Sequence, residues 1–164
     1  MQILLLLTSL AALAEPLPTL PPLVTFEKSP LLYFERVRVE VDILASPTSG
    51  PVQYRFKRTT IGRNGEDEGQ PSYTDTIYCP EALRSLQRLT DLPGPQPAVV
   101  GMEKEPSGES IRDGVAYRLS VETALPYSDG RMTLSSNVDT PLAQWVDEAL
   151  KTLQPCWRPI QLKL

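Results

Sequence analysis

The chain has 164 residues, 41% of them apolar and 22% charged, and it carries a net charge of −4 with acidic and basic residues interspersed. This balance argues against nucleic acid as the partner, because nucleic-acid binding needs a basic face and usually a high pI. The chain contains no histidine, which excludes Ser-His-Asp and Cys-His catalysis and histidine-ligated zinc. Length and composition indicate one globular domain with a core of its own.

Residues 1–14 predict an export signal. An apolar stretch runs from Ile3 to Leu13, and the small residues Ala12 and Ala14 stand where a signal peptidase cleaves. The stretch is too short to span a bilayer, which needs roughly 20 apolar residues, and no later segment approaches that length. We therefore expect a mature protein that begins at Glu15 and is located in the periplasm or outside the cell. The alternative is a buried N-terminal element, because no Lys or Arg precedes the apolar stretch.

Residues 15–30 are rich in proline and lack periodicity, so they predict an extended N-terminal arm that serves as a linker or as a docking strand. Residues 31–164 then form the single domain. Within it, the alternation of aliphatic and charged residues over 36–43 predicts a strand, and residues 52–57 predict a second, antiparallel strand.

A charged loop is expected over residues 62–69, which include the acidic run Glu66-Asp67-Glu68, and a third strand over 73–78. A helix is expected to begin at Pro80, because proline suits the first helical position, and to end before Pro93. A short strand at 99–100 is a further expectation.

The second half of the chain predicts a strand over 117–121, a turn over 128–130, a last strand at 132–134 and a final helix. Asp139 or Thr140 can cap this helix, which has an apolar stripe and is stopped by Pro155.

Cys79 and Cys156 are the only cysteines, and in an exported chain they predict one disulfide; two free buried thiols are the alternative. Cys79 precedes the first predicted helix and Cys156 follows the second. A bond between them makes the helices roughly antiparallel. The sequence therefore predicts an α+β fold of two layers, with both helices on one face of an antiparallel sheet of about five strands.

The residues most suited to binding are Arg36, Arg38, Arg55 and Lys57, which share the outward side of the first two predicted strands. Together they can form a basic patch for an anionic partner. The alternative is a set of cross-strand ion pairs with acidic neighbours such as Glu40 and Asp42. The acidic run at 66–68 does not match the ligand spacing of an EF-hand, so we expect no metal site. The sequence has no glycine-rich phosphate loop and no Ser-x-x-Lys signature, so we expect no cofactor and no catalytic residues.

The C-terminal residues Thr140-Pro141-Leu142-Ala143-Gln144-Trp145-Val146-Asp147, followed by Pro155-Cys156-Trp157, resemble small uncharacterised exported proteins of Gram-negative bacteria. This resemblance implies a periplasmic location and assigns no activity. We expect a non-catalytic binding or accessory module whose partner is an unidentified protein or envelope component. One alternative is an inhibitor of a secreted hydrolase that inserts the loop at 62–69; a second is a hydrolase that uses carboxylates.

Overall fold

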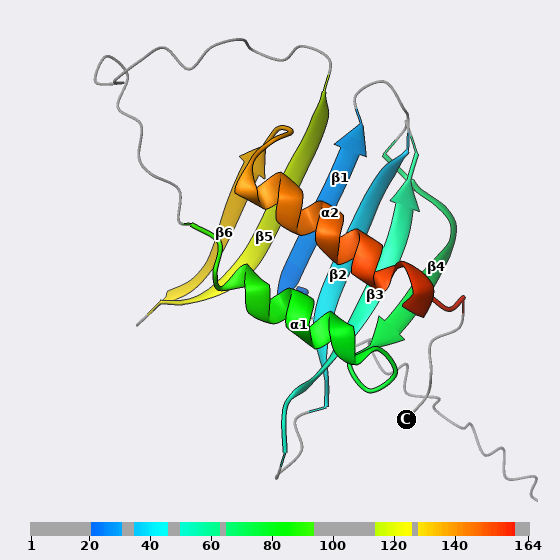
Figure 1. Ribbon diagram of the computed structural model, residues 1–164, viewed down its shortest axis with the longest axis vertical. Coiled ribbons are helices and arrows are strands. Elements are labelled where there is room, and N and C mark those ends of the chain that lie inside the picture. Colours follow the sequence, from blue (N-terminus) through cyan, green and yellow to red (C-terminus); the bar gives the residue numbers. More distant parts are fainter. Residues whose placement is uncertain are drawn as a thin grey trace, which may run out of the picture.

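A computed structural model describes residues 21–30, 35–45, 50–62, 65–93, 114–125 and 128–159. These residues form six strands, two α-helices and one short 3-10 turn. In chain order they are β1 (Val24–Pro30), β2 (Arg36–Ala45), β3 (Gln53–Ile61), β4 (Asp67–Asp75), α1 (Pro80–Leu89), β5 (Val115–Leu125), β6 (Ser128–Ser136), α2 (Pro141–Leu153) and the turn Gln154–Cys156. All strand pairs are antiparallel, and the strand order is β4-β3-β2-β1-β5-β6 (Figure 1).

β1 lies in the middle of the sheet, between β2 and β5. Of the two alternatives for the arm predicted over residues 15–30, a linker or a docking strand, residues 24–30 adopt the docking strand. The sequence hides this strand because charged side chains lie on both of its faces. Glu27 is only 7% exposed and binds Arg38, whereas Lys28 binds Asp147 of α2. This extra strand raises the strand count above the expected five or so.

Both helices lie over the same face of the sheet and run in opposite directions (Figure 1). The predicted disulfide is confirmed: the Sγ atoms of Cys79 and Cys156 are 2.10 Å apart, which joins the start of α1 to the end of α2. Between the helices, the indole Nε1 of Trp145 donates a hydrogen bond of 2.9 Å to the main-chain carbonyl of Ser85. α2 begins as expected, because the hydroxyl of Thr140 accepts a hydrogen bond of 3.1 Å from the N–H of Ala143.

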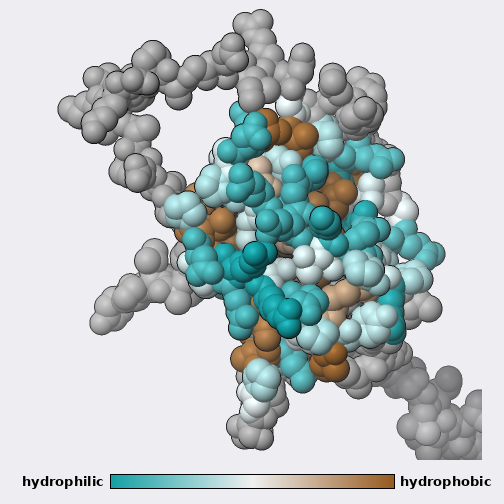
Figure 2. All heavy atoms as spheres, in the orientation of Figure 1, coloured by the Kyte–Doolittle hydropathy of each residue, from teal (hydrophilic) through white to brown (hydrophobic). Residues whose placement is uncertain are grey.

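The apolar core lies between the helices and the sheet. Phe26 of β1 meets Trp145 of α2 edge to face, with ring centroids 5.1 Å apart, a geometry that aromatic pairs favour. The largest fully buried side chains of this core are Phe26, Val39, Val41, Phe56, Leu119, Val146 and Leu153. The opposite, solvent-facing sides of the helices are mainly hydrophilic, with only separate apolar groups (Figure 2).

Two predicted boundaries are wrong. The strand predicted over 73–78 belongs to β4 and ends at Asp75 rather than at Tyr78. The carboxylate of Asp75 accepts hydrogen bonds from the N–H groups of Ile77 and Tyr78, which forms a turn there. Residues 128–130, predicted as a turn, belong to β6 and pair with β5. The predicted signal at 1–14, the first part of the arm and the predicted strand at 99–100 lie outside the described residues.

Candidate functional site

The side of the sheet that faces away from the helices, here called the outer face, collects polar side chains from every inner strand. On β2, Val39 and Val41 are buried in the core beneath the helices. Because neighbouring side chains on a strand point to opposite faces, Arg36, Arg38 and Glu40 lie on the outer face. The same alternation places Arg55 and Lys57 there, on either side of the buried Phe56.

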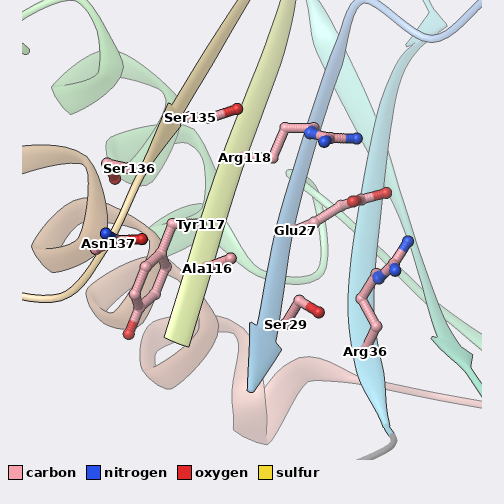
Figure 3. A pocket seen from close by; sticks show the side chains of 9 residues that line it. All are labelled: Glu27, Ser29, Arg36, Ala116, Tyr117, Arg118, Ser135, Ser136 and Asn137. Atoms are coloured by element: carbon pink, nitrogen blue, oxygen red, sulfur yellow. The ribbon is translucent and has the colours of Figure 1, made fainter. Parts of the chain in front are cut away.

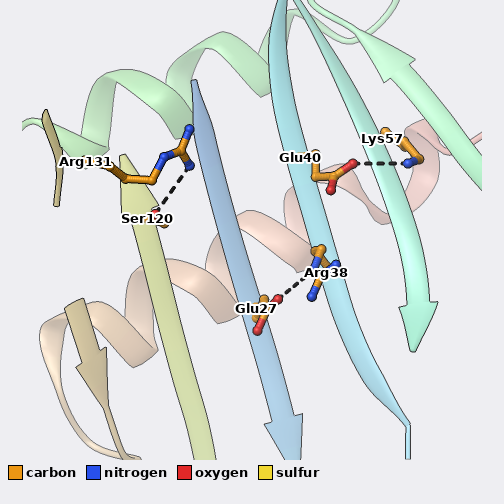
Figure 4. Close-up of polar contacts among 6 residues, drawn as sticks. All are labelled: Glu27, Arg38, Glu40, Lys57, Ser120 and Arg131. Atoms are coloured by element: carbon orange, nitrogen blue, oxygen red, sulfur yellow. Dashed lines mark hydrogen bonds and ion pairs between the residues drawn. The ribbon is translucent and has the colours of Figure 1, made fainter. Parts of the chain in front are cut away.

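Three of the four predicted cations are bound to acidic residues on the outer face. Arg38 Nε lies 2.6 Å from Glu27 Oε1, and Lys57 Nζ lies 3.1 Å from Glu40 Oε2 (Figure 4). Arg55 lies 3.9 Å from the carboxylate of Asp42 in a looser pair. For these three residues the structure contains the cross-strand ion pairs that were the alternative to a basic patch.

The side chain of the fourth cation, Arg36, has no hydrogen bond or ion pair within the part of the chain that the structure describes. It shares this property with Arg118 of β5, which the sequence analysis did not single out. Arg118 lies on the outer face because its neighbours Tyr117 and Leu119 are buried. The alternation over 117–121 was sufficient to place Arg118 outward, but nothing in the sequence placed β5 close to β2.

Glu27 lies between two arginines on the outer face. In the register of the sheet it is opposite Arg38 on one side and Arg118 on the other. Its Oε1 atom accepts the hydrogen bond from Arg38, and no hydrogen bond or ion pair joins it to Arg118. One carboxylate therefore faces two guanidinium groups and directly binds only one of them.

A hollow of about 370 Å³ opens on the outer face beside these residues (Figure 3). It lies across β2, β1, β5 and the end of β6, and it is lined by Glu27, Ser29, Arg36, Ala116, Tyr117, Arg118, Ser135, Ser136 and Asn137. Besides the carboxylate of Glu27, which binds Arg38, its wall contains two arginines, hydroxyl groups and an amide. Such groups suit an anionic or polar ligand better than an apolar one.

A second hollow of about 360 Å³ adjoins the first, since both are lined by Glu27 and Arg118. Arg131 of β6 lies along it and donates a hydrogen bond of 3.4 Å to the hydroxyl of Ser120 (Figure 4). The same guanidinium also donates to the main-chain carbonyl of Pro22. Arg131 is thereby held in place, whereas Arg36 and Arg118 keep their donors available.

The hairpin between β3 and β4 is shorter than the loop predicted over residues 62–69. β4 begins at Asp67, and the N–H of Gly62 donates a hydrogen bond of 2.9 Å to the carbonyl of Glu66, which closes the hairpin. Gly65 has φ +84°, a conformation that favours glycine. The chain here has less protruding length than the inhibitor hypothesis assumed.

A polar cluster on the helix side joins α2 to β1 and β5. Asp147 accepts a hydrogen bond of 2.7 Å from Lys28 and one of 2.9 Å from the hydroxyl of Tyr117. The hydrogen bond that Lys28 donates to Asp147 raises the pKa of Lys28, and burial together with the same carboxylate raises the pKa of Tyr117. Both groups therefore stay protonated at neutral pH, which suits a structural link and not a general base.

Within the described ranges, no group of three or more acidic or cysteine side chains is arranged to hold a metal ion. Neither α-helix in that part of the chain is long and apolar enough to cross a bilayer. No protein-family model, curated protein or solved structure matches this chain.

Proposed function

We propose that this chain is an exported, non-catalytic binding module of the periplasm or cell envelope, built of two layers. The helices and the core form one side, and the outer face of the sheet binds an acidic protein partner. The observation that carries this proposal is the pair of arginines, Arg36 and Arg118, which line an open hollow and bind no carboxylate among the described residues.

The mixed charge of the outer face favours a protein over a uniformly anionic polymer or membrane. Glu40 and Asp42 lie on the same face as the arginines, and a surface of uniform negative charge is repelled by them. A protein can instead place its own charges in register with this pattern, which gives specificity as well as attraction. The disulfide and the resemblance of the C-terminal segment to small exported proteins support the location.

The charge pairs of the outer face also favour binding over catalysis. Two carboxylates, Glu27 and Glu40, line the second hollow. Each already binds a cation, Arg38 and Lys57 respectively. Both carboxylates are therefore engaged in ion pairs on the sheet, and neither is free to act on a substrate as a paired-carboxylate hydrolase requires.

Export is tested by the intact mass of the protein from fractionated native cells, alkylated before reduction. We expect a chain that begins at Glu15, carries no alkyl groups and is found in the periplasmic fraction. Retention of Met1 with alkylation of both Cys79 and Cys156 would contradict the proposal.

The binding surface is tested by photocrosslinking in the same cells. A crosslinking amino acid at Ser135, beside the hollow, should give a defined protein adduct. The same amino acid at Arg84, on the solvent side of α1 where the side chain is 72% exposed, should not. Adducts from the helix position alone, or equal adducts from both positions, would assign the binding surface to another part of the molecule.

A further inference from the structure

The hollow beside β1 brings two arginines from distant parts of the chain to one place. Arg36 lies on β2 and Arg118 on β5, with β1 between them. Neighbouring strands are about 4.8 Å apart, so the two backbone positions lie on strands roughly 10 Å apart. Figure 3 shows the side chain of Arg118 reaching toward β1, with Ser29 of β1 between the strands that carry the two arginines.

The positive charge of this hollow is not neutralised by its acidic residue. Glu27 also lines the hollow, but its carboxylate accepts the 2.6 Å hydrogen bond from Arg38 and so balances that cation first. Arg36 and Arg118 remain as two surplus charges. A guanidinium stays protonated in proteins and offers five N–H donors in a planar fork, which matches the oxygens of carboxylates and phosphates.

We propose that this hollow is an oxyanion subsite, in which Arg36 and Arg118 bind one carboxylate or phosphate group and the hydroxyl of Ser29 supplies a further donor. The inference rests on the proposed function and names the chemical group of the partner that the outer face binds. In an acidic protein that group is the carboxylate of a side chain or of the chain end. A phosphorylated residue presents oxygens of the same chemistry.

The subsite is tested with two small probes, succinate and inorganic phosphate, added to isotope-labelled protein at constant ionic strength. We expect saturable NMR shifts of the Nε–Hε groups of Arg36 and Arg118 and of the amide of Ser29. Arg36→Gln or Arg118→Gln should weaken probe binding about ten-fold or more, because each removes charge-assisted hydrogen bonds. Both variants should fold normally, since neither arginine has a polar partner among the described residues.

Arg84→Gln is the matched control, because it removes the same charge from α1 on the helix side, where Arg84 binds Glu81. If Arg84→Gln binds the probes as tightly as the wild type, the result supports the subsite. The probe that binds more tightly then shows whether the subsite prefers a carboxylate or a phosphate. Absence of saturable shifts, or equal weakening by Arg84→Gln, would overturn it.

The photocrosslink at Ser135 separates the subsite from the proposed function. Loss of the adduct in the double variant Arg36→Gln/Arg118→Gln supports both. If the probes bind as expected but the adduct persists in the double variant, the oxyanion subsite stands and the assignment of the protein partner to it is wrong. If the adduct is lost although no probe binds, the partner uses this face without an oxyanion site.

Discussion

Replacing both cysteines by alanine is expected to destabilise the protein substantially, because the disulfide closes a large loop. Cys79 and Cys156 are 77 residues apart in sequence. In the chain-entropy description, a crosslink that closes a loop of this length lowers the free energy of folding by about 4.5 kcal/mol at 25 °C. Measured values are commonly lower, so we expect a loss of about 2 to 4.5 kcal/mol in the free energy of unfolding.

The position of the bond in the fold supports a value in the upper part of this range. Cys79 is 2% exposed and belongs to the core, so its sulfur also contributes packing that alanine does not replace. The loop between the cysteines includes α1, β5, β6 and α2. Without the bond, the unfolded chain regains the freedom of all these elements relative to one another.

The measurement is equilibrium unfolding in urea of the wild type, the reduced wild type and the variant Cys79→Ala/Cys156→Ala. With a slope of about 2 kcal/mol per molar urea, the midpoint should fall by roughly 1 to 2 M. The reduced wild type separates the effect of the crosslink from that of the lost sulfur atoms. A loss below about 1 kcal/mol would refute the reasoning, because it would mean that the bond restrains the unfolded chain very little.

Three further predictions concern α2. Thr140→Ala removes the cap hydroxyl and should lower the free energy of unfolding by about 1 kcal/mol in urea, whereas Thr140→Ser should largely preserve it. Trp145→Phe should cost about 1 to 3 kcal/mol by the same measurement, because it removes the hydrogen bond from the indole to a carbonyl of α1 and reduces the buried volume. Finally, stability should fall as pH rises above 10, the ordinary pKa of tyrosine, because the raised pKa values of Lys28 and Tyr117 mean that the folded state holds their protons more tightly. Asp147→Asn should flatten this alkaline decline and cost only about 0.5 to 1 kcal/mol at pH 7, since the side chains of the ion pair are 32% and 45% exposed; an unchanged pH profile would contradict the assigned cause.

The strands with a clear period of two could be predicted from the sequence, whereas β1, which lacks it, could not, and β4 could be predicted only in part. β2 has aliphatic residues on one face and charges on the other, which is the pattern of a half-buried strand. β1 has Glu27 on the outer face and Lys28 on the helix side, and both are satisfied by partners far along the chain or on another element. Such contacts are tertiary, so local alternation cannot reveal them.

Only the last residues of β4, within the strand predicted over 73–78, could be predicted, because the first part of β4 has a sequence that disfavours a strand. It contains Pro71 and Gly69, residues that weaken strands or confine them to edges. β4 is indeed the last strand on its side of the sheet. There Tyr73 exchanges two main-chain hydrogen bonds with Arg158, which follows α2. That pairing depends on where the disulfide places the C-terminal segment, which strand propensity does not include.

The candidate site could be predicted only in part, because the contacts that bring its residues together are also tertiary. Arg36 and Arg38 could be placed on an outward face from the alternation of their own strand. Arg118 could be placed outward as well, but its proximity to Arg36 depends on β1 lying between β2 and β5. The missing element of the site was therefore the strand that the proline-rich composition concealed.

The outer face carries more positive charge beside Glu27 than folding requires. Arg38 alone neutralises Glu27. A neutral polar residue in place of Arg118, which stands opposite Glu27 on β5, would leave this part of the outer face equally well solvated. Arg36 and Arg118 are like charges on one face, on strands separated by β1, and neither side chain has a hydrogen bond or ion pair among the described residues that would offset their repulsion. Functional sites commonly keep groups that are unfavourable until the ligand is bound. This surplus of charge distinguishes the hollow from the rest of the face, where each predicted cation has its carboxylate.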